Sequence, residues 1–189
     1  MNEPELQLLI QRAKVLGLIH DPEISPSNRA LLAAADRTKR PLTWIEANLV
    51  CLNSGIDPML IQRLQQKAES LVTAARCHLL KRQPELVLEG GSLFPPERAE
   101  ACWRDCWDFL RLVIYAVACN QSCFTDIDGM AALRELYRRM EVPTEGLNIA
   151  LGQLQLLALE EVSQSSDHQL IAACFQHLRD QLNKTAVKS

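Results

Sequence analysis

Apolar residues recur every three to four positions through most of the chain, which is the spacing of one face of an α-helix. Pairs such as Ser25-Pro26 and Asp57-Pro58, a capping residue followed by a first-turn proline, divide the pattern into segments. The pattern predicts no strand. It predicts eight helices, which begin near residues 3, 26, 41, 58, 95, 126, 143 and 165. The first of them is expected to span residues 3–18.

The longest connection without a helical pattern lies between residues 85 and 96, and the other loops are short. Short and medium helices joined by short loops favour a globin-type packing over a long four-helix bundle. The sequence therefore predicts an all-α fold in a single domain over residues 1–189.

The composition indicates a globular protein and argues against nucleic-acid binding. The 189 residues carry a net charge of −3 and are 48% hydrophobic, which is typical of a globular protein and gives no basic surface for nucleic acid. We expect no bilayer-spanning segment and no targeting segment, and so a cytoplasmic protein.

One stretch, residues 101–111, combines unusual chemistry. It holds two of the seven cysteines and two of the three tryptophans, and an almost wholly apolar run follows it. On a helix, Cys102, Cys106 and Phe109 share one face with Asp105 at its edge, whereas Arg104 points to the other side. Charge beside an apolar run is costly unless a partner compensates it. That partner is either a ligand or, more simply, a surface ion pair of Arg104 and Asp105 with Asp108 and Arg111.

Several ligands do not suit this stretch. Cys102/Cys106 and Cys119/Cys123 cannot form one zinc site, because a continuous helix places the two pairs about 25 Å apart. The sixth predicted helix has no histidine to hold a haem. No acid–base cluster indicates an enzyme, so we expect no metal ligand and no catalytic residue.

A linear tetrapyrrole, or bilin, fits the residues better. A cysteine thiol can add to an unsaturated substituent of a ring, and an arginine suits the propionates by its forked geometry. A carboxylate can accept hydrogen bonds from the pyrrole N–H groups. Cys102, Arg104 and Asp105 supply these three groups on adjacent turns.

The same stretch resembles the bilin-attachment helix of the phycobiliproteins, whose pattern is Cys-x-Arg-Asp, then an aromatic residue, Leu-Arg, an apolar pair and Tyr. Here the matching residues are Cys102 to Asp105 and Phe109 to Tyr115. Leu133 to Tyr137 and Val142-Pro143 resemble the family's segment Leu-Arg-Glu-Thr-Tyr followed by Val-Pro. The likeness covers roughly residues 57–183 and is weaker before them.

The resemblance implies a globin-like core over residues 39–183, preceded by a pair of N-terminal helices in residues 1–38 and followed by a frayed tail at 184–189. In the family such a helical pair clasps a partner subunit. We therefore expect a homodimer or a phycobiliprotein-like partner through these helices, and an association with the thylakoid surface through phycobilisomes.

The resemblance also implies roles for single residues. Cys102 would form the thioether to phycocyanobilin or a related bilin, Arg104 would pair a propionate, and Asp105 would accept the central pyrrole N–H groups. We expect Trp107 and Phe109 to line the pigment, and a contact between the tryptophan and a partner subunit is the alternative.

Other positions depart from the family pattern. Trp103, Cys106, Trp107 and Asp108 are unusual beside the motif, and residues 89–92 lack the family's polar loop. These departures favour a divergent paralogue linked to bilin handling, light harvesting or sensing over a standard antenna subunit. Two alternatives stay open: a pigment-free structural or regulatory partner of phycobilisomes, and a factor for bilin attachment or turnover.

Overall fold

The computed structural model describes residues 3–184, and the rest of the expected frayed tail, residues 185–189, lies outside the described part. Within residues 3–184 the chain forms eight α-helices and two 3-10 turns, which confirms the all-α prediction. The helices are α1 (Glu3–Arg12), α2 (Pro26–Arg37), α3 (Trp44–Ser54), α4 (Pro58–Arg82), α5 (Pro96–Ala118), α6 (Ile127–Arg139), α7 (Thr144–Glu160) and α8 (Ser165–Asn183). The 3-10 turns are Leu18–His20 and Pro84–Val87.

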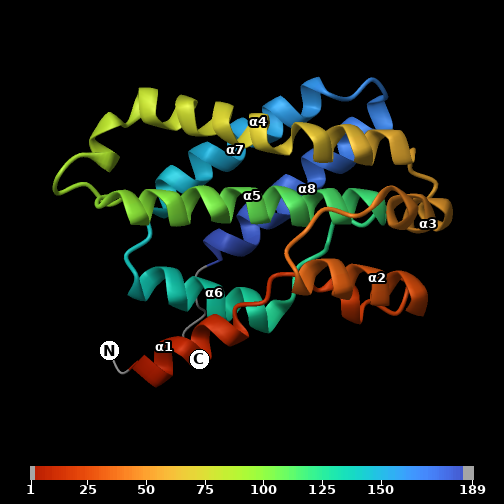
Figure 1. Cartoon of the computed structure of the whole chain (residues 1–189), viewed down its shortest axis with the longest axis horizontal. Helices are drawn as coiled ribbons and strands as arrows, with labels where there is room; N and C mark the ends of the chain where they lie inside the picture. Colours follow the sequence, from red (N-terminus) through yellow and green to blue (C-terminus); the bar gives the residue numbers. More distant parts are fainter. Residues whose placement is uncertain (1–2, 185–189) are drawn as a thin grey trace.

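Helix α5 is the centre of the molecule, with α4 on one side and α1 and α6 on the other (Figure 1). It packs against α4, α7 and α8, and every residue from 109 to 118 is buried. The loop before α5 and helix α3 lie at opposite ends of the molecule (Figure 1). A helix that is apolar all round has to be covered on every face, so the second half of α5 fixes the arrangement of its neighbours.

Local capping explains where several helices begin. The side chains of Ser25, Asp57 and Asp126 each accept a hydrogen bond from a backbone N–H in the first turn of α2, α4 and α6. Proline at the first turn of α4 and α5 costs no hydrogen bond, because those N–H groups have no partner within the helix. These signals are local, which is why the sequence predicts the bounds closely.

The first helix is shorter than the predicted span of residues 3–18. It ends at Arg12, and residues 13–17 instead run along the segment before α6. The Gly17 N–H donates to the Phe124 carbonyl at 2.7 Å, and the Asp126 N–H donates to the Val15 carbonyl at 2.8 Å. A Cβ atom on Gly17 would lie 2.7 Å from the Thr125 carbonyl carbon, so this close approach requires glycine.

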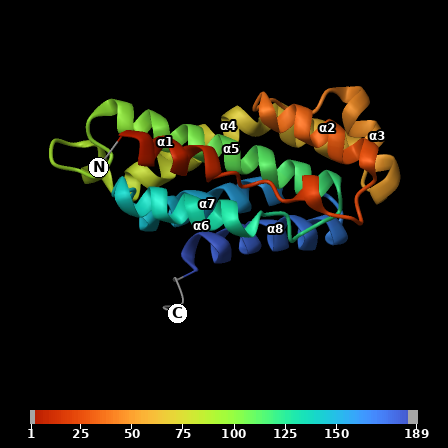
Figure 2. The ribbon, with the colours of Figure 1, turned by 90° about the horizontal axis from the view of Figure 1, so that it is seen from below.

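The N-terminal helices fold back on their own chain. Helix α1 packs along α6, and both views place these two helices side by side (Figures 1 and 2). Asp36 of α2 forms an ion pair with Arg111 of α5 at 2.9 Å. A clasp on a partner subunit through these helices therefore stays a prediction, and it would use the faces that α1 and α2 leave exposed.

The start of α3 is held by a capping box joined to an ion pair. Thr43 and Glu46 exchange the two capping hydrogen bonds, and Arg40 donates two further bonds to the Glu46 carboxylate, each 2.7 Å long. The hydrogen bonds from Arg40 are the main reason why the pKa of Glu46 falls from 4.5 to about 2. The carboxylate therefore contributes stability above pH 4.5, and this contribution is lost as pH falls towards 2.

We expect Glu46→Gln to lower the free energy of unfolding by about 1 kcal/mol at pH 7, because glutamine keeps the capping bond but loses the charge. The loss should shrink below pH 4.5 and vanish near pH 2. Urea denaturation over this pH range measures it. Glu69→Gln, at an exposed position of α4, is the control, and an equal loss in both variants would contradict the assignment.

Candidate functional site

The first half of α5 carries the cysteine, arginine and aspartate of the motif on different sides of the helix. Cys102 is buried at 6% exposure and shares its face with the fully buried Cys106 and Phe109. Asp105 is half-buried and Arg104 is exposed. The structure therefore has the thiol facing inward, the carboxylate at the boundary and the guanidinium in solvent, as the helical spacing predicts.

The two thiols of this face lie one helical turn apart and are hydrogen-bonded to each other. A hydrogen bond with Cys102, together with burial, raises the pKa of the Cys106 thiol well above its usual value. Cys106 therefore stays protonated at neutral pH and is a poor nucleophile. Cys102, nearer the start of the helix, is the better candidate for a covalent attachment.

Asp105 is bound by one side chain, Tyr137 of α6. The Tyr137 hydroxyl donates to Oδ2 of Asp105 at 2.7 Å. Burial is the main cause that raises the pKa of the Asp105 carboxyl, and the Tyr137 hydrogen bond opposes it in part. Within residues 3–184 no basic side chain forms an ion pair with Asp105, so its charge is only partly compensated.

Tyr137 is the site residue that sequence reasoning missed. Its spacing from Leu133 places it on the apolar face of the sixth predicted helix, and its ring is buried accordingly. Burial and the neighbouring Asp105 raise its pKa well above the ordinary value, so its hydroxyl stays a hydrogen-bond donor. The pairing joins residues 32 positions apart, and no local pattern in the sequence signals it.

The Arg104 side chain makes no hydrogen bond or ion pair with another residue of the described part of the chain. Its neighbours in sequence behave differently, because Arg111 and Asp108 pair with each other at 3.2 Å. A surface ion-pair cluster of all four charges, the simplest alternative for this stretch, is therefore wrong for Arg104 and Asp105. The guanidinium of Arg104 is left available for an anionic group.

Arg111 is buried, which the helical spacing alone does not predict. Its guanidinium pairs with Asp36 at 2.9 Å and with Asp108, and it donates to the Tyr115 hydroxyl at 3.2 Å. Lys39 reaches the second oxygen of Asp108 at 2.6 Å. We call Asp36, Asp108, Arg111 and Tyr115 the Arg111 cluster, and it joins α2 to α5.

The structure does not bring Trp107 to the face of Cys102 and Asp105. Its ring lies 5.9 Å from the Arg111 guanidinium and lines a small cavity with Pro41 and Gln65. Phe109 is buried on the Cys102 face, as the spacing predicts. Their roles in lining a pigment stay predictions, and the position of Trp107 makes it the weaker of the two.

Trp103 packs on the side of α5 that faces α4. Arg76 lies 5.3 Å from its ring, and the buried indole N–H has no hydrogen-bond partner among the residues that the structure describes. Trp103 therefore belongs to the contact between the two helices rather than to the surface around Arg104.

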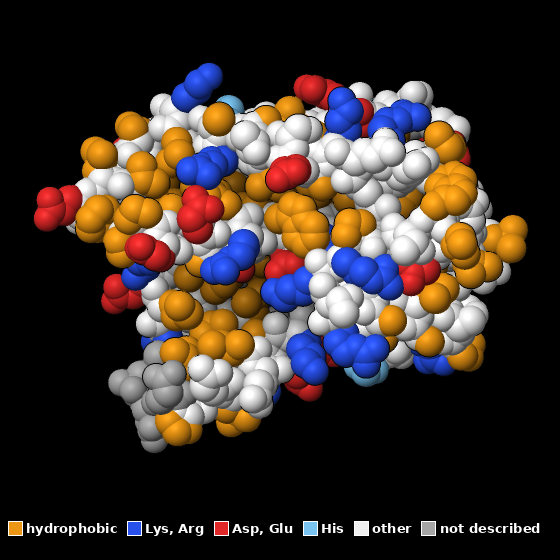
Figure 3. All heavy atoms as spheres, in the orientation of Figure 1, with side chains coloured by type: hydrophobic (Ala, Val, Ile, Leu, Met, Phe, Trp, Pro, Cys, Tyr) orange, Lys and Arg blue, Asp and Glu red, His pale blue; other side chains and the backbone are white. Residues whose placement is uncertain are grey.

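The surface beside the motif is concave. Figure 3 shows a hollow between α5 and α6 on this face, next to the first half of α5, with hydrophobic side chains on its walls. The Asp105–Tyr137 hydrogen bond joins the same two helices. An apolar hollow with a few polar groups at its edge is the usual form of a small-molecule site.

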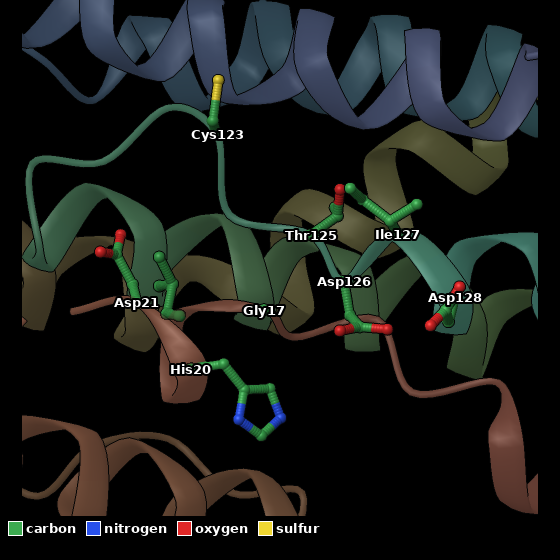
Figure 4. Close-up of a pocket in the computed structure, with 9 residues that line it drawn as sticks. Gly17, His20, Asp21, Cys123, Thr125, Asp126, Ile127 and Asp128 are labelled. Atoms are coloured by element: carbon green, nitrogen blue, oxygen red, sulfur yellow. The ribbon is translucent and has the colours of Figure 1, made fainter.

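A separate cavity of about 370 Å³ lies between the Gly17–Asp21 turn and the start of α6 (Figure 4). Asp21, Asp126 and Asp128 line it together with His20. In residues 3–184 no group of three or more His, Cys, Asp or Glu side chains is placed to hold a metal ion. This cavity is remote from Cys102, and its acidic lining does not suit a ligand with carboxylates.

No helix in the described part of the chain has the length and apolar character needed to cross a bilayer. The structure and the site together define an all-α, globin-like protein with a thiol, a carboxylate and a cation on the first half of α5, which lies next to an apolar hollow.

Comparison with known proteins identifies the family to which this all-α protein belongs. The family described as "Phycobilisome protein" matches residues 31–182. The chain therefore belongs to the phycobilisome protein family. The match begins within α2, so α1 lies outside it.

Individual relatives agree with this assignment. The chain is 34% identical to the C-phycocyanin beta chain of Galdieria sulphuraria over 93 residues, which is 49% of this chain and 53% of that one. It is 28% identical to the R-phycocyanin beta chain of Polysiphonia urceolata over 125 residues, 66% of this chain and 73% of that one. The chain thus spans about half the length of several curated relatives that it matches.

A solved structure supports the fold. It is a far-red fluorescent biliprotein derived from an allophycocyanin F subunit of Chroococcidiopsis thermalis, with a TM-score of 0.61 and 20% sequence identity. The similarity covers 67% of this chain and 96% of that one. At this identity the comparison confirms the globin-like fold and says nothing of function.

Proposed function

We propose that this protein binds a bilin covalently through Cys102. The observation that carries the proposal is Asp105, a half-buried carboxylate near the thiol of Cys102 in sequence. Among residues 3–184 it has one neutral hydrogen-bond donor and no ion pair. A protein gains nothing in stability from such a group, so a ligand is the natural source of its missing partners. The relatives named phycocyanin and the biliprotein with a similar fold support a bilin as the ligand.

Each residue of the motif has a defined role in this proposal. Cys102 holds the pigment as a thioether, and the thiol hydrogen goes to the neighbouring carbon of the ring substituent. Asp105, oriented by Tyr137, accepts hydrogen bonds from pyrrole N–H groups, and Arg104 pairs with a propionate. Bound in this way, the tetrapyrrole supplies a conjugated system that absorbs visible light.

Phe109 lines the apolar wall behind Cys102, and Trp107 reaches the pigment only if its ring turns away from Arg111. Phycocyanobilin is the bilin we propose. The protein acts as a divergent phycobiliprotein in light harvesting, sensing or bilin handling, and it is not an enzyme. We further propose a cytoplasmic location at phycobilisomes.

The partner in this proposal is a second copy or another phycobiliprotein subunit, held through the exposed faces of α1 and α2. Leu8 and Ile10 of α1 are about half exposed and supply apolar surface for that contact. Because α1 already packs on α6, a partner would add to this contact rather than replace it.

Co-production with phycocyanobilin tests the proposal. The chain should become coloured and should fluoresce with zinc on a denaturing gel, because only a covalently attached bilin stays with the unfolded chain. Colour that is lost on denaturation would show a non-covalent carrier. A colourless chain, even with a bilin lyase supplied, would favour the pigment-free structural partner.

Asp105→Asn should stabilise the pigment-free chain, since it removes a carboxylate whose pKa is raised chiefly by burial. A raised native pKa means that the ionised side chain opposes folding at neutral pH and that this penalty is absent below the ordinary carboxyl pKa of about 4. We expect a gain of about 1 kcal/mol at pH 7, or roughly 3 °C in the melting temperature, which shrinks as pH falls towards 4.

Thermal melts of both proteins from pH 4 to pH 8 measure this gain. Asp128→Asn, at an exposed position of α6, is the control and should change stability little. The pigment-loaded Asp105→Asn protein should at the same time show altered absorbance, because the acceptor for the pyrrole N–H groups is changed. If Asp105→Asn is less stable than wild type at pH 7, the ionised Asp105 side chain does not oppose folding and the assignment is wrong.

A further inference from the structure

Asn28, in the first turn of α2, is a buried polar side chain without a partner. It is 5% exposed, the same fraction as Arg111, whose guanidinium has its partners in the Arg111 cluster. The Asn28 backbone N–H donates to the Ser25 hydroxyl at 3.3 Å, but the side-chain carboxamide forms no hydrogen bond with another residue of the described part of the chain. Burying an amide without hydrogen bonds is unfavourable, so a bound molecule is a natural source of them.

Asn28 lines a cavity of about 250 Å³ at the point where α2 begins and where α3 and α5 end. Helices α2 and α3 and the end of α5 lie in the same half of the molecule (Figure 1). The Ser54 hydroxyl donates to the Ala118 carbonyl at 2.6 Å, and the Asn120 carboxamide donates to the Ser54 carbonyl at 3.4 Å. These two bonds hold the end of α3 against the end of α5 and so fix one wall of the cavity.

The lining consists mainly of groups that both donate and accept hydrogen bonds. The polar residues that surround Asn28 are Glu23, Ser25, Asn53, Ser54, Asn120 and Gln121. A helix N-terminus also leaves backbone N–H groups without a partner in the helix, and a C-terminus leaves carbonyl groups. The cavity therefore suits a ligand that carries donors and acceptors side by side.

Other classes of ligand suit the cavity less well. Among the described residues that line it there is no lysine or arginine, and the carboxylate of Glu23 would repel an anion. The same lining has no aromatic ring on which a nucleobase could stack. Burial raises the pKa of the Cys119 thiol in the wall to about 12, so this thiol is neither a nucleophile nor a metal ligand at neutral pH.

An extended polypeptide has the pattern of donors and acceptors that Asn28 needs. In an extended chain the N–H and C=O of one residue point the same way, so Oδ1 and Nδ2 of one carboxamide can bind both. The cavity has the volume of about eight water molecules at roughly 30 Å³ each, which is room for about two residues of main chain.

We propose that this cavity binds an extended segment of a partner protein through its main chain, and that Asn28 pairs with the N–H and C=O of one residue of that segment. The site is separate from the motif around Cys102 and does not depend on a bound pigment. It lies at the start of α2 and uses neither Leu8 nor Ile10 of α1.

Nuclear magnetic resonance of the full, pigment-free chain tests the proposal with N-acetylglycine N-methylamide, an uncharged probe that carries one complete residue. The side-chain amide signals of Asn28, Asn53 and Gln121 should move and saturate, with a dissociation constant on the order of 10 mM for so small a ligand. N-acetylsarcosine dimethylamide, which has the same carbonyl groups but no N–H, should bind at least tenfold more weakly.

Asn28→Leu keeps the size of the side chain and removes its hydrogen bonds. It should abolish the saturable shifts and leave the melting temperature equal or higher, because a buried amide without partners has been removed. Asn28→Asp keeps one acceptor and loses the donor, and it should weaken binding at least tenfold in a chain that folds. Asn48→Leu, on α3 outside the cavity, is the matched control and should leave the titration unchanged.

Signals that do not saturate up to about 0.1 M probe would show that the cavity holds only water, and this would overturn the proposal. Equal binding of the sarcosine analogue, or binding that both Asn28 variants leave unchanged, would overturn it as well. None of these results bears on the attachment of a bilin to Cys102, because the titration contains no pigment.

Discussion

Cys102→Ala should abolish the zinc-fluorescent band on a denaturing gel, whereas Cys106→Ala should keep it. Both thiols are buried on the same face of α5, one turn apart, so the pair is a matched comparison. Cys106 is the more buried of the two, at 1% exposure against 6% for Cys102, and burial helps to raise the pKa of its thiol well above the ordinary value. Only Cys102 is then expected to form the thioether.

The comparison requires that both variants fold. Each substitution removes one sulfur atom from the core, a small loss of volume, and each pigment-free variant can be checked by its thermal melt before it is loaded. Arg104→Ala adds an independent readout, since it should reduce pigment loading while Cys102 is intact. A fluorescent band of wild-type strength in Cys102→Ala would place the attachment elsewhere.

Arg111→Ala should lower the free energy of unfolding by about 3 kcal/mol, the largest effect on stability that we expect of any charged residue in this chain. The guanidinium is 5% exposed and holds two carboxylates, Asp36 of α2 and Asp108 of α5. Removing it leaves those carboxylates next to each other, with only Lys39 to compensate Asp108. It also leaves the Tyr115 hydroxyl with one partner fewer.

Arg104→Ala is the matched control, because it removes the same side chain from the same helix at an exposed position. Its effect should stay within about 0.5 kcal/mol. Urea denaturation followed by circular dichroism compares the two variants. Equal effects would contradict the account in which the Arg111 cluster anchors α2 on α5.

The sequence predicted the helices well because their boundaries are local. Capping by Ser25, Asp57 and Asp126 depends on residues two or three positions away, and the apolar stripes mark the buried faces. The one long error, the end of α1 at Arg12 rather than near residue 18, comes from pairing with the segment before α6. That pairing joins residues more than 100 positions apart in the chain.

The difference between local and long-range contacts also explains which features of the site could be predicted. The spacing of Cys102, Arg104 and Asp105 on one helix gave their relative directions, and the structure agrees with them. Tyr137 beside Asp105 and Asp36 beside Arg111 come from other helices, 32 and 75 positions away. Such contacts depend on how helices pack, and a single sequence does not encode them in any local pattern.

Four residues beside the motif depart from the family pattern: Trp103, Cys106, Trp107 and Asp108. In the structure three of them make contacts within the chain. Trp103 lies under Arg76, Trp107 beside Arg111, and Asp108 in the Arg111 cluster. These departures stabilise the surroundings of the motif, and Cys102, Arg104 and Asp105 remain in place for a pigment.

Peptide mapping of the pigment-loaded protein tests whether the bilin is attached to Cys102. Trypsin cuts after Arg98, Arg104 and Arg111, so Cys102 and Cys106 fall on separate peptides, 99–104 and 105–111. If Cys102 holds the bilin, visible absorbance and the added mass of the bilin should stay with peptide 99–104 alone. Pigment on peptide 105–111, on any other peptide, or on none of them would contradict it.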